Sequence, residues 1–371
     1  MSLADEIKAA KPTPKPSSPV WKGPEEDGIT FSLLCRFLSC RERFRITVVE
    51  GFKPEPVFNH KIEYGSMWHA CEEVIAKYNA NIGDADWIGS LVKYTQGLCK
   101  TYPLSQQEIF HWHSVCLTQF PLYYEFWRKN EHTVGRTPVL QEKVFNVQYK
   151  LPSGRLVRLR GKFDSVDLVA DKLWLQENKS KGDIKEDKIR RQLKFDLQTM
   201  LYLVALEEYM ETSFWQRSNK AWRSKEIAGV RYNVVKRPLS GGEGTIRQHK
   251  PSKSNPKGES KAEFYHRLSG IIKEAAPSYF MRWVVPISKE DITKFKNQCL
   301  NPILENLCGW WEHVTTGRNS LADLMPMNWR HPFGVYNVLD EGGSTDLDNY
   351  LETGSTVGLR RVENLFPELT E

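Results

Sequence analysis

The chain has little that would point to a secreted or membrane protein. Its seven cysteines, at positions 35, 40, 71, 99, 116, 299 and 308, include no CxxC pair. This spacing excludes the zinc and redox motifs built on paired cysteines, and an odd, unpatterned set argues against a disulfide framework. No stretch approaches the roughly 20 apolar residues of a spanning helix. The N-terminal segment lacks the apolar core of a signal peptide, so we expect a soluble, cytoplasmic protein.

The sequence also lacks a strong excess of charge and a nucleotide-binding loop. A net charge of +6 is too mild to indicate nucleic-acid binding by itself. No Walker A loop is present, so the chain carries no helicase signature. The basic residues are unevenly distributed, because residues 217–261 hold twelve Lys or Arg against three Glu. A Gly-, Ser- and Pro-rich loop in this segment either neutralises phosphates or is merely solvated.

The most informative residues lie on a predicted hairpin. Two strand-like segments, GKFDSVDLV and LWLQENK, are separated by a short turn. A loop centred between Ala170 and Asp171 pairs Asp164 with Glu177, and Lys179 shares the face of Glu177. Ala-Asp fits a primed two-residue turn poorly, so a four-residue loop with the same centre is an equal alternative. The three side chains form either a divalent-cation site suited to phosphodiester hydrolysis or a surface salt bridge.

Predicted helices precede and follow this hairpin in the sequence. Downstream, residues 190–210 show apolar side chains at helical spacing, with Gln198 and Tyr202 four apart on one face. Upstream, residues 62–78 read as a helix that begins near Gly65, which places His69 in its first or second turn. A neutral imidazole there can ligate a metal, although a lone helical histidine is more often structural.

In identity and order these residues resemble the motifs of the RecB-like nucleases of the PD-(D/E)XK superfamily, which include bacteriophage exonucleases and CRISPR-associated nucleases. That family carries G-x-x-x-H, G-x-x-D, E-x-K and Q-x-x-x-Y in this order. The chain matches these motifs with Gly65 and His69, Gly161 and Asp164, Glu177 and Lys179, and Gln198 and Tyr202. The resemblance covers roughly residues 30–300.

The resemblance implies a metal site. By this likeness His69, Asp164 and Glu177 ligate Mg²⁺ or Mn²⁺, with the backbone carbonyl of Asn178 as a further ligand. Oxygen and imidazole ligands accept both ions, and the histidine tilts the set slightly toward Mn²⁺. Lys179 is implied to position or activate the attacking water.

Other residues are expected to contact the nucleic acid. The resemblance implies that Gln198 and Tyr202 organise the site and contact the backbone of the substrate. A basic run bordering the proposed metal is the expected phosphate track, and it consists of Lys181, Lys185, Lys188, Arg190, Arg191 and Lys194.

One motif of the family points to a cofactor that we do not expect here. Cys40, with Ser32 and Phe44, stands where iron-sulfur members have their first cluster ligand. The remaining ligands of those relatives form a cysteine group near the C-terminus, and no cysteine follows Cys308. We therefore expect no cluster and interpret Cys40 as a small buried hydrophobe.

The expected fold class is α/β, with a restriction-endonuclease-like core in which helices flank a central mixed β-sheet, and with a helical insertion. We expect a disordered lead-in over residues 1–28, a nuclease domain over 29–340 and a C-terminal tail over 341–371. Within the nuclease domain, residues 66–135 are expected to form a helical subdomain, and 141–300 the catalytic sheet with its flanking helices.

The functional expectation is a metal-dependent deoxyribonuclease with exonuclease action in DNA recombination, repair or phage DNA processing. Such a protein would act in the cytoplasm of a bacterial or phage-infected host cell. The alternatives are a structure-specific or restriction-type endonuclease and a non-catalytic DNA-binding module with the same fold. DNA is the expected partner, a helicase or recombination protein is a candidate second partner, and no membrane is expected.

Overall fold

The structure is a computed structural model of the whole chain. It describes residues 19–78, 82–130, 136–184, 196–239, 246–253, 256–316, 347, 349–350 and 353–369. The chain separates into two compact units. Unit 1 comprises Met1–Glu55, Gln148–Arg160 and Leu300–Glu371, and unit 2 comprises Pro56–Val147 and Gly161–Cys299.

Unit 2 contains the longest helices and most of the sheet. Its helices are α4 (His60–Tyr78), α5 (Trp87–Thr101), the 3₁₀ turn η2 (Pro103–Ser105), α6 (Gln106–Asn130), α8 (Leu197–Met210), α9 (Ser213–Gln216), α10 (Lys220–Arg223), α11 (Lys261–Glu274), α12 (Ala276–Tyr279) and α13 (Lys289–Phe295). Its strands are β4 (Lys172–Lys181), β5 (Ile227–Lys236), β6 (Phe280–Pro286), and parts of β2 (Thr137–Lys150) and β3 (Leu156–Val169), which continue into unit 1. The π-helical turn η3 (Lys296–Leu300) follows α13.

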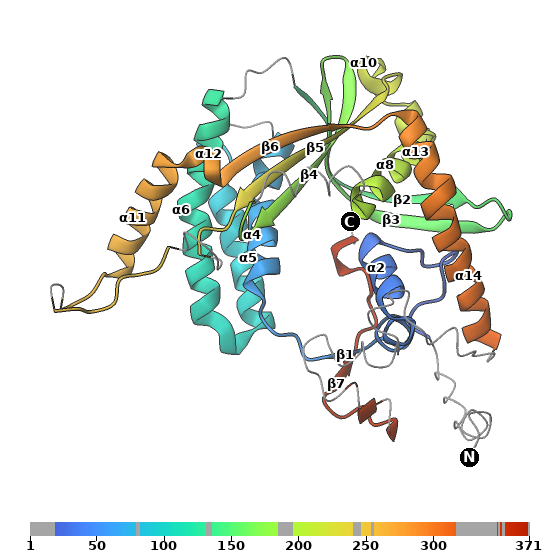
Figure 1. Cartoon of the computed structure of the whole chain (residues 1–371), viewed down its shortest axis with the longest axis horizontal. Helices are drawn as coiled ribbons and strands as arrows, with labels where there is room; N and C mark the ends of the chain where they lie inside the picture. Colours follow the sequence, from blue (N-terminus) through green and yellow to red (C-terminus); the bar gives the residue numbers. More distant parts are fainter. Residues whose placement is uncertain are drawn as a thin grey trace. The chain divides into compact units, whose positions relative to one another are not determined.

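Strands β2 to β6 form a five-stranded mixed sheet (Figure 1). Its strand order is β2-β3-β4-β5-β6, and β4 pairs antiparallel with β3 but parallel with β5. Strand β6 closes the order with an antiparallel ladder on β5. The predicted α/β class, with a mixed sheet and flanking helices, is therefore confirmed.

The hairpin between β3 and β4 has the register predicted from the sequence. Ala170 and Asp171 alone form its turn, with φ angles of 49° and 63°, so the primed two-residue turn occurs despite their side chains. The ladder ends at the pair Ser165↔Gln176. Asp164 and Glu177, the pair predicted to form the cation site, directly follow this last pair of the ladder.

Helix α4 begins at His60, earlier than expected. Asn59 lies just before it, and its side-chain oxygen accepts the backbone N–H two residues later at 3.0 Å. His69 therefore lies in the third turn of the helix and not in its first or second. Gly65 lets α4 approach β4 closely, because a Cβ at this position would lie 3.2 Å from Ser180 Oγ.

Helix α8 begins at Leu197, later than the helix expected from residue 190. Asp196 is its N-cap, with an extended backbone and a carboxylate that accepts the N–H of Thr199 at 3.0 Å. Residues 185–195 lie outside the described residues.

The core of unit 2 is rich in aromatic side chains. Helices α4, α5 and α6 pack on one another, and α11 packs on α6. Trp68 of α4 contacts the rings of Phe120 and Tyr123 of α6, each with its centroid 5.0 Å away. Among the described residues, no helix combines the length and apolarity needed to cross a membrane.

Unit 1 is assembled from distant stretches of the chain. Its elements are α2 (Phe31–Ser39), α3 (Arg41–Phe44), the π-helical turn η1 (Arg45–Val49), β1 (Phe52–Pro54), α14 (Asn301–Thr316), β7 (Leu359–Arg361) and the 3₁₀ turn η4 (Pro367–Leu369). Strand β7, in the segment expected to be a tail, pairs antiparallel with β1. Trp21 is fully buried and donates to the carbonyl of Gly28 at 2.8 Å, so the fold begins before the expected boundary at residue 28. Cys40 is buried, as interpreted from the sequence.

Candidate active site

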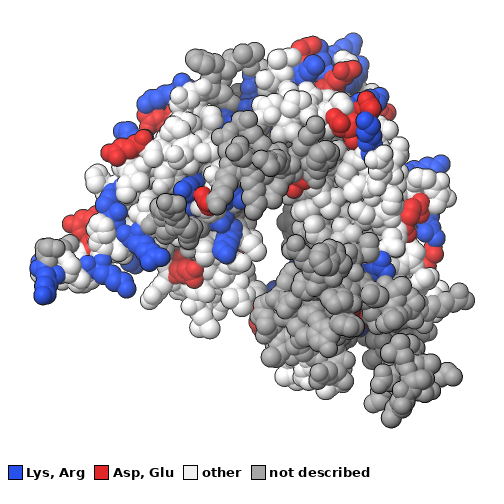
Figure 2. All heavy atoms as spheres, in the orientation of Figure 1, with Lys and Arg blue, Asp and Glu red and all other residues white. Residues whose placement is uncertain are grey.

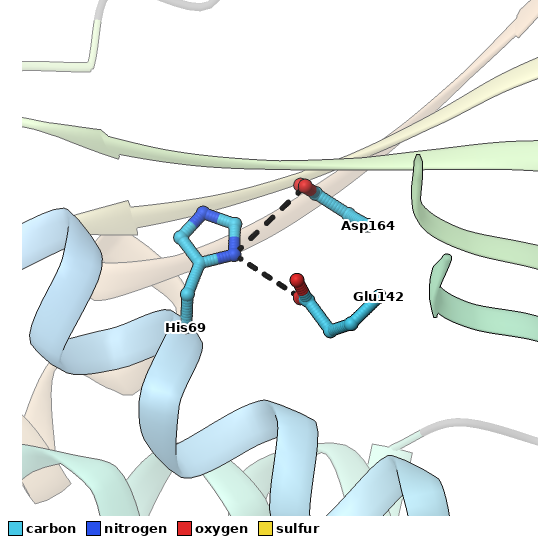
Figure 3. A group of neighbouring side chains, drawn as sticks. All are labelled: His69, Glu142 and Asp164. Carbon is cyan, nitrogen blue, oxygen red and sulfur yellow. Dashed lines mark hydrogen bonds and ion pairs between the residues drawn. The ribbon is translucent and has the colours of Figure 1, made fainter. Parts of the chain in front are cut away.

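Three side chains that could hold a metal ion converge between α4 and the strands β2 and β3 (Figure 3). Nδ1 of His69 lies 3.5 Å from Glu142 Oε1 and 3.9 Å from Asp164 Oδ1. One ligand atom from each residue lies within 4.8 Å of the other two. A cation that binds nitrogen and oxygen at about 2.0 to 2.5 Å can bridge such a span. The predicted proximity of His69 and Asp164 is therefore present, with Glu142 as the third member.

Sequence reasoning missed Glu142. This residue lies inside β2 with a φ of 44°, in the left-handed region that strands avoid. Leu140 and Phe145 are both buried although a regular strand would point them to opposite faces. The backbone irregularity between them turns the Glu142 carboxylate toward His69. The odd, five-residue spacing of these two apolar residues is a signal of this irregularity in the sequence.

The glycine of the G-x-x-D motif has a packing role. A Cβ at Gly161 would lie 2.6 Å from Phe145 Cζ and 3.3 Å from Tyr202 Cε1. Only glycine allows β3 to pass these rings without a shift. Asp164, one residue beyond Phe163, accepts the backbone N–H of Asn178 through Oδ2 at 2.8 Å, which fixes its carboxylate beside β4.

Glu177, Lys179 and Gln198 form a second group. Lys179 Nζ donates to Glu177 Oε1 and to Gln198 Oε1, both at 2.6 Å, and Gln198 Nε2 donates to Glu177 Oε1 at 2.7 Å. Glu177 is 2% exposed. Its second oxygen, Oε2, is buried and has no hydrogen-bond partner among the described residues. One oxygen of a buried carboxylate is thus left for a ligand.

The electrostatics link the two groups. Burial and the charge of Asp164 raise the pKa of Glu177 to about 7, despite the neighbouring ammonium of Lys179. Burial also raises the pKa of Asp164. Burial lowers the pKa of His69, but the carboxylates of Asp164 and Glu142 outweigh it and bring this pKa to about 10. Near neutral pH the cluster therefore retains protons that a divalent cation would displace.

Two predicted residues are held by other contacts. The ring of Tyr202 packs edge-on against Phe145 and Phe163, with centroids 5.4 and 6.1 Å away. The side-chain oxygen of Asn178 accepts from Asn233 Nδ2 at 2.9 Å, which leaves its proposed backbone role untouched.

The predicted phosphate track is described only at its beginning. Lys181, the last residue of β4, is exposed. Although its side chain reaches solvent, partial desolvation by neighbouring groups and the nearby charges of Lys179 and Arg237 lower its pKa. The remaining predicted residues, Lys185, Lys188, Arg190, Arg191 and Lys194, lie outside the described residues.

A further basic surface lies on the segment that leads into α11. Figure 2 shows Lys and Arg side chains on this projecting part of unit 2. Arg247, Lys250, Lys253 and Lys257 are exposed there. This segment belongs to the Gly-, Ser- and Pro-rich basic loop noted in the sequence within residues 217–261.

The fold and these residues agree with the comparison to known families. The chain matches the PD-(D/E)XK nuclease superfamily over residues 29–288, more than two thirds of its length, and it belongs to that superfamily. A comparison with curated proteins gives no match. Nucleases of this superfamily typically use a divalent metal ion. The oxygen and imidazole donors of the His69 group, and the unpartnered oxygen of Glu177, suit such an ion.

Proposed function

We propose that this protein is a RecB-like, metal-dependent deoxyribonuclease that acts as an exonuclease in DNA recombination, repair or phage DNA processing. The observation that carries this proposal is the position of a metal-ligand group beside a buried acid–lysine pair. The ligand group is His69, Glu142 and Asp164, and the pair is Glu177 with Lys179. Superfamily membership and the basic segment before α11 support it further.

One set of residues is proposed to hold a divalent cation. A divalent cation bound here would polarise a phosphoryl oxygen and lower the pKa of a water molecule. His69, Glu142 and Asp164 would hold it. Glu177 is not part of this group, whose ligand atoms lie within 4.8 Å of one another, and we propose its Oε2 as a further ligand. The carbonyl of Asn178 completes the set that we propose.

Lys179 is placed to act on the substrate. Its ammonium is held between Glu177 Oε1 and Gln198 Oε1, both at 2.6 Å, so its position is defined. From there it would orient the attacking water and stabilise the negative charge that develops at the phosphoryl group. Burial opposes its charged form, but Glu177 more than compensates and raises the pKa of Lys179, so it stays protonated at neutral pH.

Cleavage of linear DNA by purified protein with Mn²⁺ or Mg²⁺ tests the proposal. We expect Glu177→Ala and Lys179→Ala to bind DNA but to cut it about 10³-fold more slowly, the upper range for loss of one electrostatic stabiliser. Lys294→Ala is a matched control, because this lysine forms an exposed pair with Glu290 on α13 at 2.8 Å. Equal cutting by the wild type and by both site variants would overturn the assignment of the site.

Covalently closed circles separate the two nuclease modes. An exonuclease leaves circular single strands and circular duplexes intact while it degrades the same DNA after linearisation. Rapid cutting of closed circles would contradict exonuclease action and favour the endonuclease alternative.

A further inference from the structure

A pocket of about 420 Å³ adjoins the metal-ligand group. Glu142 and Asp164 line it together with Tyr124, Trp127, Arg128 and Arg282. The pocket therefore joins the acidic site to an aromatic and basic wall that is supplied by α6 and β6. Its volume is in the range of pockets that bind one small organic molecule, roughly 300 to 1,000 Å³.

Two polar groups in the pocket wall lack partners among the described residues. Gln176 is 5% exposed, and its Oε1 is buried without a hydrogen bond. The indole Nε1 of Trp127 is likewise buried and unpaired. Both residues line the pocket. An unmet acceptor and an unmet donor in one pocket suit a ligand whose edge carries both functions, and a nucleobase has such an edge.

The aromatic wall is held in place. The guanidinium of Arg282 lies 4.1 Å from the centroid of Trp127, and its Nε donates to Asn233 Oδ1 at 3.1 Å. Arg282 Nη2 also donates to the hydroxyl of Tyr123 at 3.2 Å. These contacts fix the indole, so its N–H has a defined position in the pocket wall.

The charge of the pocket depends on the metal. Three arginines line it, Arg128, Arg136 and Arg282, against four carboxylates, Glu72, Glu73, Glu142 and Asp164. A divalent cation on the ligand group would add positive charge at the acidic end of the pocket. A phosphate group is therefore favoured more strongly in the pocket when the cation is present.

We propose that this pocket binds a single unpaired nucleotide of DNA next to the bond that is cut. This inference rests on the proposed function, since it specifies the substrate of the same site. The base contacts Trp127 and Gln176, and the phosphate faces Arg128 and the metal-ligand group. A stacked base pair leaves no single base free to enter, so the nuclease prefers single-stranded or frayed ends to continuous duplex.

Calorimetric titration with deoxyadenosine monophosphate tests the pocket without any cleavage. We expect saturable binding with Mn²⁺ present and at least tenfold weaker binding without it. Loss of the N–H donor and of the aromatic wall in Trp127→Ala weakens binding about tenfold or more, and Gln176→Leu weakens it severalfold. Lys129→Ala is the matched control, because this lysine neighbours Arg128 but pairs with Glu125 at 2.6 Å and does not line the pocket.

The conservative variant Trp127→Phe controls for the case in which Trp127→Ala fails to fold. It keeps a smaller aromatic ring in the wall and removes the indole N–H, so we expect binding between that of the wild type and Trp127→Ala. Unchanged thermal unfolding midpoints would show that all variants are folded. Wild-type affinity in both Trp127→Ala and Gln176→Leu, or no saturable binding with Mn²⁺, would overturn the pocket assignment.

The pocket and the proposed nuclease can fail separately. If the protein binds the mononucleotide with Mn²⁺ but cuts no DNA, the nuclease proposal fails and the pocket stands. If it cuts continuous duplex as fast as single strands, and Trp127→Ala leaves that ratio unchanged, the pocket inference fails and the nuclease stands.

Discussion

Each of the two units buries a cluster of carboxylates. We call a cluster complete when every carboxylate oxygen has a hydrogen-bond partner, and only the cluster of unit 1 is complete in this sense. In unit 1, Arg45 Nε donates to both oxygens of Glu42 at 3.0 Å, and the same guanidinium bonds Glu50. The hydroxyl of Tyr350 donates to the other Glu50 oxygen at 2.6 Å. Burial raises the pKa of Glu50, yet each of the four carboxylate oxygens has a partner.

In unit 2 the corresponding oxygens are not all used. Oε2 of Glu177 and Oε2 of Glu72 are buried and have no hydrogen-bond partner among the described residues. The carboxylate of Asp164 instead raises the pKa of both His69 and Glu177. Buried polar groups are normally paired, so an incomplete cluster indicates a ligand site, whereas a complete one indicates a structural role.

Removing the arginine of the complete cluster gives the largest expected effect. Arg45→Met leaves two buried carboxylates without their cation, and breaking such a group costs about 3–5 kcal/mol. The exposed fraction of the Arg45 side chain is only 9%, so water cannot replace it. We expect the free energy of unfolding in urea to fall by about this amount.

An exposed arginine of the same unit provides the control. Arg155 pairs with Glu312 at 2.6 Å, but the two side chains are 39% and 57% exposed. Arg155→Met is expected to cost less than about 1 kcal/mol. Equal losses in the two variants would mean that the Arg45 cluster does not stabilise unit 1 in the way its contacts suggest.

The incomplete cluster is expected to bind Mn²⁺ with a steep dependence on pH. The cation must displace a proton from His69, whose pKa is about 10, and below neutral pH another from Glu177, whose pKa is about 7. Affinity therefore rises about tenfold per pH unit above pH 7 and more steeply below it. Calorimetric titration at pH 6, 7 and 8 measures this dependence.

The same titration on variants identifies the groups involved. In His69→Ala, Mn²⁺ no longer displaces a proton from the imidazole. We therefore expect this variant to bind Mn²⁺ more weakly, and its affinity to depend little on pH above pH 7. A pH-independent affinity in the wild type would contradict the assignment of His69 as a ligand.

The sequence predicted the parts of the site that follow from regular strand geometry. Alternation and a constant register placed Glu177 and Lys179 on one face and brought Asp164 beside β4. Glu142 was missed because it reaches the site through a positive φ within β2, and no alternation rule contains such a residue.

The helix boundaries were missed for a different reason. The apolar periodicity begins before Asp196, so it gave no sign that the carboxylate of Asp196 caps the N-terminus of α8. Asn59 is likewise a residue type that favours the start of a helix, and it lies ahead of the apolar pattern by which α4 was recognised. The contact of Asn233 with Asn178 joins strands that are far apart in sequence, and only the parallel ladder of β4 with β5 brings them together.

Glu177→Gln, which neutralises one acid of the incomplete cluster, has the smallest expected effect on the free energy of unfolding. Unlike Arg45→Met, it is expected to stabilise the protein. The folded-state pKa of Glu177, about 7, lies above its ordinary value of 4.5, so the folded protein binds the additional proton and loses stability as pH rises between these values. Glu177→Gln removes this penalty but also the ion pair with Lys179, and we expect a net gain of about 1 to 2 kcal/mol at pH 8 without metal. At pH 5 the gain is expected to vanish.

Urea unfolding in the presence of a chelator measures this gain. Glu207→Gln, which alters a partly exposed pair with Lys296 at 2.8 Å, is the control and is expected to change stability by less than about 0.5 kcal/mol at either pH. With Mn²⁺ we expect the wild type to become more stable than Glu177→Gln, because the ion stabilises the wild type by about 2.7 kcal/mol at a hundred times its dissociation constant. It stabilises Glu177→Gln less, since this variant has lost the free carboxylate oxygen. A loss of stability in Glu177→Gln at pH 8 without metal would show that Glu177 is a structural acid, like those around Arg45, and would remove the distinction between the two clusters.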